Sequence, residues 1–402
     1  MNGVDKGVKA NVASILILGG DADGNLGDRA IQQAMCGSLT ALRPDLELTV
    51  VSNDADRVRR TSGASTIERG PRGFLAFCRA VRRSRLVLVG GGGLFQDDDS
   101  LVKMPYWAAR IALVRLLGRP VVGYALGAGP LSSATGRASA RLAFPLMRTI
   151  TVRDAAAALV AQPLSAKPVT IVPDPAIGLR PAPRSVARET MRAAGVPLDG
   201  RPLVGVALRR WFPPAPRLIP HKIARRLGVA DPQTGAEGQR LLDLVAQVLD
   251  RLVAIDDVFP VFLPSYTSTY EADHVLCRAV LDRMKQSRGA VVMVDDPSIY
   301  KACCGELAVL LGGRMHPMIL AAAMGTPVVG LAYNPKFGGF LQLIGRADAC
   351  VEVEDFVREG DPTVLAGLLG DALRAGRGPP DGAMSLAAQV LAFDAALLAE
   401  IT

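Results

Sequence analysis

The chain has 402 residues, of which 50% are hydrophobic and 21% are charged, so global disorder is excluded and two domains can each bury a core. Its 41 glycines and 28 prolines follow no fixed period, which excludes collagen-like and simple repeat architectures. Aromatic residues make up only 5%, too few for a platform that stacks single-stranded nucleic acid, so no nucleic-acid partner is expected. The six cysteines form no CxxC pair, and we expect reduced thiols in a cytoplasmic protein without a zinc site.

The net charge of +8 is concentrated in one stretch of the chain. Residues 57–85 carry nine arginines and one acid, Glu68, which equals the whole excess. Such a face fits a polyanion, an anionic membrane surface or a phosphorylated acceptor, whereas a solvated arginine-rich helix is the simpler interpretation. No run approaches 18 apolar residues, so we expect no spanning helix, and only peripheral contact at the inner face of the membrane through residues 57–85.

Short apolar runs rich in β-branched residues recur along the chain, separated by stretches with helical spacing such as 106–117, 238–252 and 317–324. The first run leads into glycines and an acidic loop, so it predicts a strand and not a signal peptide. Strands are predicted at residues 14–18, 46–51, 86–89, 121–126, 149–152, 169–172, 203–208, 258–263, 291–294, 307–311 and 328–331. Continuous apolar strands indicate parallel sheets covered on both faces, so the fold class is α/β with two Rossmann-like doubly wound domains facing a cleft.

The proline-rich stretch at residues 179–202 predicts the junction between the two domains. We place an N-terminal, acceptor-side domain at residues 1–185, a C-terminal, donor-side domain at 186–380, and a final helix within 381–402. Residues 211–239 contain five prolines and predict either a long loop that folds over the cleft or a disordered insertion. Ligands of such folds bind where parallel strands end, between the domains.

Three glycine-rich turns follow strands in the first half. In the first, Gly27 permits a close turn and Asp28 is placed to cap a helix that starts at Arg29, but neither a Walker A nor a dinucleotide pattern is present. The second is a run of four glycines that includes Gly92 and Gly93, and it offers backbone that a ligand can approach. The third occupies residues 127–130.

The glycine run is followed by three adjacent aspartates at residues 97–99. Adjacent residues cannot all point at one ion, so a metal site is the less favoured interpretation. We interpret Asp97 as the functional carboxylate. A structural alternative is an acidic first turn of the following helix.

The second half places an arginine and a histidine at the start of a helix. Arg314 and His316 follow a buried strand and two glycines, the second of which is Gly313, so they stand beside unpaired backbone N–H groups. A capping histidine is the alternative, and His221 and His274 carry no such signal. Strand ends of one sheet share an edge, so a small ligand bearing carboxylate and phosphate is expected to be surrounded by Arg209, Arg314, His316 and Lys336.

Further polar residues at strand ends are open to two interpretations. Tyr333 follows a strand and precedes Lys336, and we count it with the substrate-binding residues. Arg153, Asp154 and Asp174 also stand at strand ends, where a structural ion pair with helix caps is at least as good an explanation as a site.

Taken in order, these motifs resemble the polysaccharide pyruvyl transferase family. The resemblance rests on residues 24–28, 91–97, 127–130, 152–154, 173–176, 314–317 and 333–336. It implies a fold like that of GT-B glycosyltransferases. It also implies transfer of the pyruvyl group of phosphoenolpyruvate, as co-substrate, to a sugar of a cell-surface polysaccharide or its lipid-linked precursor, giving a pyruvate ketal and phosphate, with no cofactor and no metal.

The resemblance also assigns roles. The Arg-x-His pair of the family falls on Arg314 and His316, its strand-end arginine on Arg209, and the carboxylate after its glycine run on Asp97. We expect His316 to act as acid, Asp97 as base and Arg314 to bind the donor. The expected substrate-binding residues are Arg209, Lys336, Gly92, Gly93, Asn25, Asp28, Gly313 and Tyr333.

Two other functions fit parts of this sequence. A glycosyltransferase of the same fold would use a nucleotide sugar, with its diphosphate at the helix that starts near Pro317. A non-catalytic binder of polyanions or membranes would use residues 57–85, but it leaves the glycine turns at the strand ends unexplained.

Overall fold

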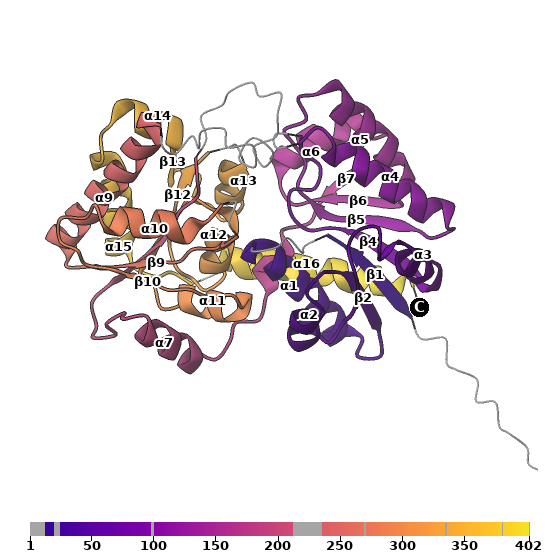
Figure 1. The fold of residues 1–402 in the computed structure, drawn as a ribbon, viewed down its shortest axis with the longest axis horizontal. Coiled ribbons are helices and arrows are strands. Elements are labelled where there is room, and N and C mark those ends of the chain that lie inside the picture. Colours follow the sequence, from indigo (N-terminus) through magenta and orange to yellow (C-terminus); the bar gives the residue numbers. More distant parts are fainter. Residues whose placement is uncertain are drawn as a thin grey trace, which may run out of the picture.

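The computed structural model describes residues 13–19, 25–97, 100–211, 235–268, 271–333, 336–379 and 381–401, without the side chains of residues 336 and 381. These residues form two parallel sheets, each flanked by helices (Figure 1). The chain therefore has two Rossmann-like domains, as the alternating pattern predicts. Most of the predicted loop at residues 211–239 falls outside the described residues, and the helix α9 (Ala236–Asp256) already begins inside that range.

The N-terminal domain is built on a seven-stranded sheet with the order β3-β2-β1-β4-β5-β6-β7. Its strands are β1 (Ser14–Leu18), β2 (Glu47–Val51), β3 (Ser65–Ile67), β4 (Leu86–Gly90), β5 (Val121–Leu126), β6 (Thr149–Val152) and β7 (Val169–Ile171). Its α-helices are α1 (Leu26–Leu42), α2 (Ala55–Ser62), α3 (Phe74–Arg83), α4 (Lys103–Leu116), α5 (Ala134–Leu146) and α6 (Ala155–Ala161). Two short 3₁₀ turns complete it, η1 (Gln162–Leu164) and η2 (Pro175–Gly178).

The C-terminal domain has a six-stranded sheet with the order β10-β9-β8-β11-β12-β13. Its strands are β8 (Leu203–Ala207), β9 (Phe259–Phe262), β10 (Ala290–Val291), β11 (Val309–Gly312), β12 (Val328–Ala332) and β13 (Cys350–Glu352). Besides α9, the helices after the first sheet are α7 (Arg184–Ala193), α10 (Asp273–Leu281), α11 (Pro297–Cys304), α12 (Met315–Ala322), α13 (Lys336–Leu343), α14 (Val353–Glu359), α15 (Thr363–Ala375) and α16 (Asp381–Ala399).

Ten of the eleven predicted strands coincide with an observed strand, the one predicted at residues 291–294 shares only Val291 with β10, and the structure adds β3 and β13. Both additions are three-residue strands at a sheet edge, and each contains polar residues. Strands in the middle of a parallel sheet are buried on both faces and read as apolar runs, whereas short edge strands carry no such run. The pattern therefore predicts the centre of each sheet better than its edges.

The arginines of residues 57–85 do not form one face, contrary to the sequence interpretation. Val58 of α2 packs in the same core cluster as Ile15 and Ile17 of β1, whereas Phe77 of α3 packs with Leu16 on the other side. Successive side chains of a strand point to opposite faces, so α2 and α3 cover opposite faces of the sheet. The arginines on α2 are thereby separated from those on α3.

The first helix begins earlier than predicted. It starts at Leu26, and the N-cap is Asn25, whose side-chain oxygen accepts a 3.0 Å hydrogen bond from the backbone N–H of Gly27. Asp28 lies in the first turn and does not cap a helix starting at Arg29. Asparagine and aspartate are equally good N-caps, so sequence alone does not choose between these starts.

The chain crosses between the domains twice. The first crossing follows η2, where the buried ammonium of Lys301 on α11 donates to the carbonyl oxygens of Ile177 and Leu179 at 2.8 and 2.7 Å. Burial lowers the pKa of Lys301 to about 8. The second crossing leads into α16, which returns to the N-terminal domain and packs against α1 and η2 (Figure 1).

Helix α16 is held on the N-terminal domain by a buried carboxylate. Tyr124 and Ser38 donate to Asp394 at 2.7 and 2.5 Å. Within the described residues, Gly382–Ala399 is the one segment long and apolar enough to span a membrane, although the sequence suggested none. Length and composition are weak evidence, and here the helix carries a charged group that bonds to the domain beneath it.

This anchor predicts a pH-dependent stability. Burial raises the pKa of Asp394 to about 6, against the opposing hydrogen bonds from Ser38 and Tyr124. The folded state therefore binds more protons than the unfolded state between about pH 4 and 6, and the free energy of unfolding falls by up to about 3 kcal/mol as pH rises through this window. Thermal melts should show this loss in the native chain and a flatter profile in Asp394→Asn; equal slopes would contradict the assignment.

Candidate active site

The carboxyl ends of strands from both sheets meet between the domains. Gly27 follows β1, Asp174 follows β7, Arg209 follows β8, and the Arg314–His316 pair follows β11. The backbone N–H of Leu26 in the first domain donates to the carbonyl oxygen of Ser265 in the second at 2.9 Å. The predicted placement of polar groups at a shared edge therefore extends across the two sheets.

His316 lies in the first turn of α12 and reaches into the N-terminal domain. Its Nε2 is 3.4 Å from Oδ2 of Asp174, and this nitrogen is buried without a well-aligned hydrogen bond. A Cβ added to Gly27 would lie 2.0 Å from Nδ1, so the imidazole packs directly on the glycine backbone at the start of α1. Only glycine leaves room for the ring in this position.

Asp174 connects His316 to a second cation. Nη1 of Arg153 lies 3.3 Å from the same Oδ2 of Asp174. Nε of Arg153 lies 3.4 Å from Oδ2 of Asp154. Burial would raise the pKa of Asp174, but His316, Arg153 and a backbone N–H together hold it below its usual value. Asp154 and Asp174 also accept backbone hydrogen bonds at the starts of α6 and η2, so the ion-pair and capping interpretation holds for both. Asp174 additionally faces His316.

Asp28 is a half-buried carboxylate on the same side of the domain interface. Its Oδ2 accepts a 2.9 Å hydrogen bond from Asn25, and its Oδ1 would lie 3.0 Å from a Cβ at Gly92. Burial raises the pKa of Asp28, although the positive charges of His316, Lys103 and Arg69 oppose that rise. A raised pKa makes the ionised carboxylate a stronger proton acceptor.

Arg314 is bound by two carboxylates. Its guanidinium donates to Asp273 from two nitrogens at 2.8 and 2.6 Å, and to Glu271 at 2.9 Å. The ring of Tyr266 lies 5.2 Å away. Burial lowers and the two carboxylates raise the pKa of Arg314, with a net rise, so the group stays charged.

Arg209 reaches the same carboxylate from the neighbouring strand end. Its Nη2 is 3.7 Å from the second oxygen of Glu271, and its guanidinium stacks 4.0 Å from the centre of the Tyr333 ring. A Cβ at Gly313 would lie 3.3 Å from the backbone nitrogen of Arg209, so this glycine allows β8 and β11 to end close together. The structure thus brings Arg209, Arg314, Gly313 and Tyr333 into one group.

The two arginines are not the free cations that the sequence suggested. Both guanidinium groups are partly buried, and Glu271 lies between the two, where a ligand anion was expected. Sequence reasoning missed Glu271 and Asp273, which follow β9 and could have been found by applying the strand-end rule to that loop. The side chain of Lys336 lies outside the described residues.

Comparison with known sequences decides the family. A sequence model of the family described as "Polysaccharide pyruvyl transferase" matches residues 25–335, most of the chain. The chain belongs to the polysaccharide pyruvyl transferase family. No curated protein matches this family member.

Solved structures confirm the GT-B-like fold of this family member. Escherichia coli ADP-heptose LPS heptosyltransferase II is 15% identical, with a TM-score of 0.52 over 90% of this chain and 99% of that one. UDP-GlcNAc 2-epimerase from Methanocaldococcus jannaschii is 11% identical, with a TM-score of 0.58 over 90% and 92%. The epimerase from Neisseria meningitidis, bound to UDP-GlcNAc, is 9% identical, with a TM-score of 0.56 over 97% and 99%. At these identities the likeness is one of fold alone.

In this pyruvyl transferase family member, the carboxylate of Asp97 accepts hydrogen bonds that hold the start of α5. Its two carboxylate oxygens accept hydrogen bonds from the backbone N–H groups of Ser132 and Ser133 at 2.9 and 2.8 Å, and from the Ser133 hydroxyl at 2.5 Å. Burial would raise its pKa, but these bonds lower it below the usual value. Gly93 was also predicted to bind substrate. A Cβ added there would lie 2.6 Å from Oε1 of Gln96, so the near neighbour of this glycine is Gln96 and not His316.

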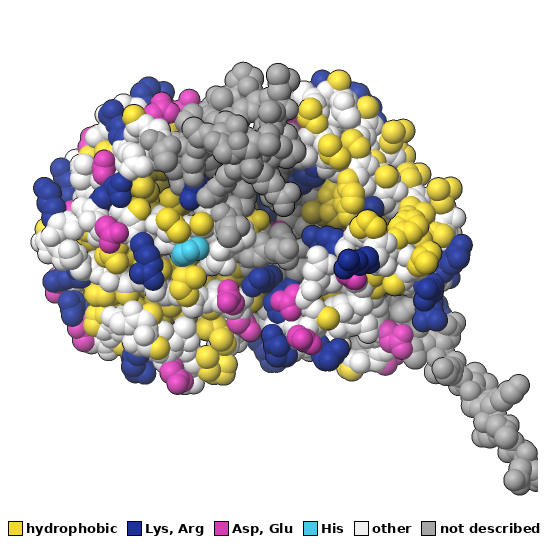
Figure 2. Space-filling model, in the orientation of Figure 1, with side chains coloured by type: hydrophobic (Ala, Val, Ile, Leu, Met, Phe, Trp, Pro, Cys, Tyr) yellow, Lys and Arg dark blue, Asp and Glu magenta, His cyan; other side chains and the backbone are white. Residues whose placement is uncertain are grey.

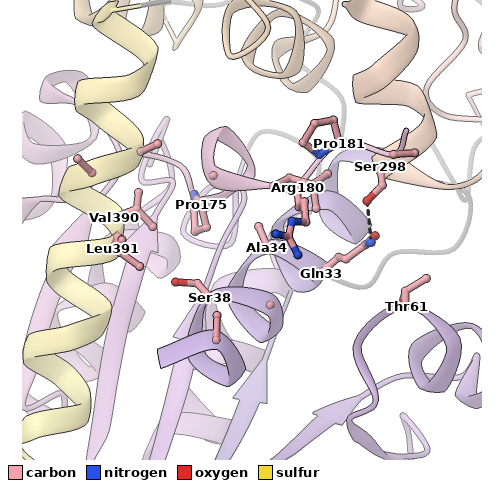
Figure 3. A pocket seen from close by; sticks show the side chains of 17 residues that line it. Gln33, Ala34, Ser38, Thr61, Pro175, Arg180, Pro181, Ser298, Val390 and Leu391 are labelled. Atoms are coloured by element: carbon pink, nitrogen blue, oxygen red, sulfur yellow. Dashed lines mark hydrogen bonds between the residues drawn. The ribbon is translucent and has the colours of Figure 1, made fainter. Parts of the chain in front are cut away.

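A cavity of about 670 Å³ lies away from these strand ends. Figure 3 shows it between α1, α16 and the linker after η2, with Gln33 bonded to Ser298 at one wall. Small apolar side chains line most of it, and Arg180 is the one charged residue among the described residues that line it. Across the described ranges, no group of three or more His, Cys, Asp or Glu residues could hold a metal ion.

The contact between Gly27 and His316 predicts a sensitive position. In Gly27→Ala the new methyl group must displace the imidazole, and a displacement of this size should lower transferase turnover by about 100-fold or more. Gly37→Ala is the matched control, because it lies in the same helix with open space around it and should stabilise the fold by about 0.5–1 kcal/mol. Turnover and thermal melting of both variants would check this, and an active Gly27→Ala protein would refute it.

Proposed function

We propose that this chain transfers the pyruvyl group of phosphoenolpyruvate to two hydroxyls of a sugar, forming a pyruvate ketal and releasing phosphate. The observation that carries the proposal is His316 of one domain set against Asp174 and Gly27 of the other, two residues from Arg314. Family membership supports a transferase that acts on polysaccharide. Phosphoenolpyruvate carries a carboxylate and a phosphate on a three-carbon frame, which suits two adjacent arginines.

The donor site is assigned to the pair of arginines that share Glu271. A carboxylate or phosphate oxygen of the donor would take the place of one Glu271 oxygen between Arg209 and Arg314. Asp273 holds two nitrogens of Arg314 and keeps its guanidinium plane fixed during that exchange. The aromatic ring of Tyr333 supports Arg209 from the other side. Lys336 remains a proposed further donor ligand.

His316 is the proposed general acid. The carboxylate of Asp174 lies 3.4 Å from Nε2 and fixes which edge of the imidazole faces the N-terminal domain. Nε2 faces that carboxylate, so Nδ1, on the Gly27 side, is the atom left to serve the donor. It would protonate the methylene carbon of the enol and give an oxocarbenium-like centre on the carbon that bears the phosphate.

Asp28 is the stronger candidate for the general base, and Asp97 the weaker. Asp28 lies within electrostatic reach of His316, and its pKa is raised by burial. Asp97 has a lowered pKa and spends its oxygens on Ser132 and Ser133, so it is a poor proton acceptor. A base that must be ionised loses activity as pH falls through its raised pKa.

The proposed reaction balances in protons. The first sugar hydroxyl attacks the cationic carbon and gives its proton to Asp28, and the carbon–oxygen bond to phosphate then breaks. The second hydroxyl attacks the same carbon and closes the ketal. Of the two hydroxyl protons, one replaces the proton that His316 delivered to the methyl group and the other leaves with phosphate. No metal or redox partner is required by this sequence of steps.

The acceptor class and location are part of the same proposal. We assign a cell-envelope polysaccharide or its lipid-linked precursor as acceptor, because the family acts on polysaccharide. All six cysteines are free thiols, and four of them are buried, which agrees with a reducing cytoplasmic setting.

The activity itself is tested by mixing the protein with phosphoenolpyruvate and candidate glycans. We expect phosphate release that depends on acceptor, together with a product heavier than the acceptor by pyruvate less water. His316→Ala should fold normally and lose turnover by about 100-fold or more. Turnover of nucleotide sugars with no use of phosphoenolpyruvate would instead support a glycosyltransferase, and full activity in His316→Ala would remove the acid role.

The choice of base is tested with two isosteric variants. Asp28→Asn should lower kcat by about 100-fold or more, because the proton acceptor is gone. Asp97→Asn should change kcat by less than about threefold and lower the free energy of unfolding by about 1–2 kcal/mol, because it weakens the bonds to Ser132 and Ser133. Steady-state kinetics and chemical denaturation separate the two effects. The reverse pattern would restore Asp97 as base.

A further inference from the structure

Large apolar side chains are exposed where α3 and α4 begin. Leu75 is 66% exposed and Val102 is 71% exposed. Their exposed apolar neighbours are Phe74, Leu101 and Tyr106. We call this surface, with the arginines around it, the α3–α4 face.

Side-chain contacts join the two helices into one surface. The guanidinium of Arg110 on α4 stacks 4.7 Å from the ring centre of Phe77 on α3 and 5.0 Å from that of Tyr106. Arg119, after α4, donates to the carbonyl oxygen of Arg82 on α3. Figure 2 shows hydrophobic side chains gathered on this domain with Lys and Arg side chains beside them. The apolar patch is therefore continuous with basic groups.

The charge of this surface is mainly positive. Residues 69–85 and 100–119 contain ten lysines and arginines and no aspartate or glutamate, although the exposed Glu68 precedes the first stretch and three aspartates precede the second. By contrast, α2 on the opposite face of the sheet carries Asp56, and its Arg57 is paired with Asp54 at 3.3 Å. An apolar patch beside an excess of basic groups matches a surface that is negative outside and apolar within.

The face lies beside the candidate active site. The N-terminal ends of α3 and α4 stand at the same edge of the sheet as Asp28, because both helices follow the carboxyl ends of parallel strands. Arg69, before α3, and Lys103, at the start of α4, act electrostatically on the Asp28 carboxyl. A partner seated on the face would therefore meet the edge where the site opens.

We propose that the α3–α4 face binds the surface of a bilayer that contains anionic lipids. The apolar tips of Leu75, Leu101 and Val102 enter the headgroup layer, and the aromatic ring of Tyr106 lies at its boundary. The arginines contact phosphate groups. A bilayer supplies both the negative charge and the apolar interior, whereas a protein partner would need an acidic rim around an apolar centre.

Binding to lipid goes beyond the transfer reaction and does not depend on it. If the chain also has the proposed function, lipid binding places the strand ends of the active site near the membrane surface. A sugar carried on a lipid is then within their reach, and this step rests on the proposed function. The substrate class is then a lipid-linked glycan.

Flotation with vesicles tests the proposal without any activity assay. The full chain should bind vesicles of phosphatidylcholine with phosphatidylglycerol at least about tenfold more tightly than phosphatidylcholine alone, and the binding should weaken as salt is added. The apolar variant Leu101→Ser/Val102→Ser and the charge variant Arg72→Glu/Arg79→Glu should each reduce binding about fivefold or more. All proteins are first compared by thermal melting, so that an unfolded variant is recognised.

A matched control separates this face from net charge. Arg59→Glu/Arg60→Glu makes the same change of charge on exposed residues of α2, on the opposite face of the sheet, and should leave binding within about twofold. The proposal is overturned if this control loses as much affinity as the α3–α4 charge variant, if the apolar variant binds like the native chain, or if no vesicle is bound. Failure here leaves the phosphate-release assay untouched.

Discussion

The packing of the His316 imidazole on the backbone of Gly27 is the contact that sets the geometry between the domains. A histidine at the start of one helix can rest on the start of another only where that second helix presents no side chain. The contact aligns the carboxyl edges of two separate sheets and brings Asp174 within 3.4 Å of the ring. Asp174 and Asp28 are held within the N-terminal domain by Ala176 and Asn25, and the contact places the His316 ring against them.

The arginines illustrate how a binding site is kept folded without its ligand. Arg314 is largely shielded from solvent, with 13% of its side chain exposed, and a charge in that position is stabilised when it is paired and hydrogen-bonded. Asp273 provides a fixed partner, and Glu271 provides a second one that is shared with Arg209. An incoming anion must therefore compete with the Glu271 carboxylate for the two arginines. Its binding affinity reflects the difference between the arginine–ligand and the arginine–Glu271 interactions, and not the full strength of the first.

The sequence predicted the central strands, the two-sheet architecture and the grouping of Arg209, Arg314 and Tyr333, because buried strands have a clear apolar pattern and their ends share an edge. It could not assign partners. Glu271 lies in the loop before α10 and Asp273 is the first residue of that helix, so no periodicity marks either of them. Whether Asp97 or Asp28 accepts hydrogen bonds from a turn depends on contacts between residues far apart in the chain, such as that of Asp97 with Ser132. The arginines of residues 57–85 lie on two faces of the first sheet because α2 and α3 cover opposite faces. This follows from the strand order, which a single sequence does not give.

The return of α16 to the first domain has a mechanical consequence. The linker after η2 and the N-terminal half of α16 lie side by side, with Ile177 and Leu386 lining one small cavity, and Lys301 fastens the linker to the second domain. The two connections between the domains thus meet along one line. A rotation about that line is the opening motion that both connections permit, and it would separate the strand ends at Gly27 and His316.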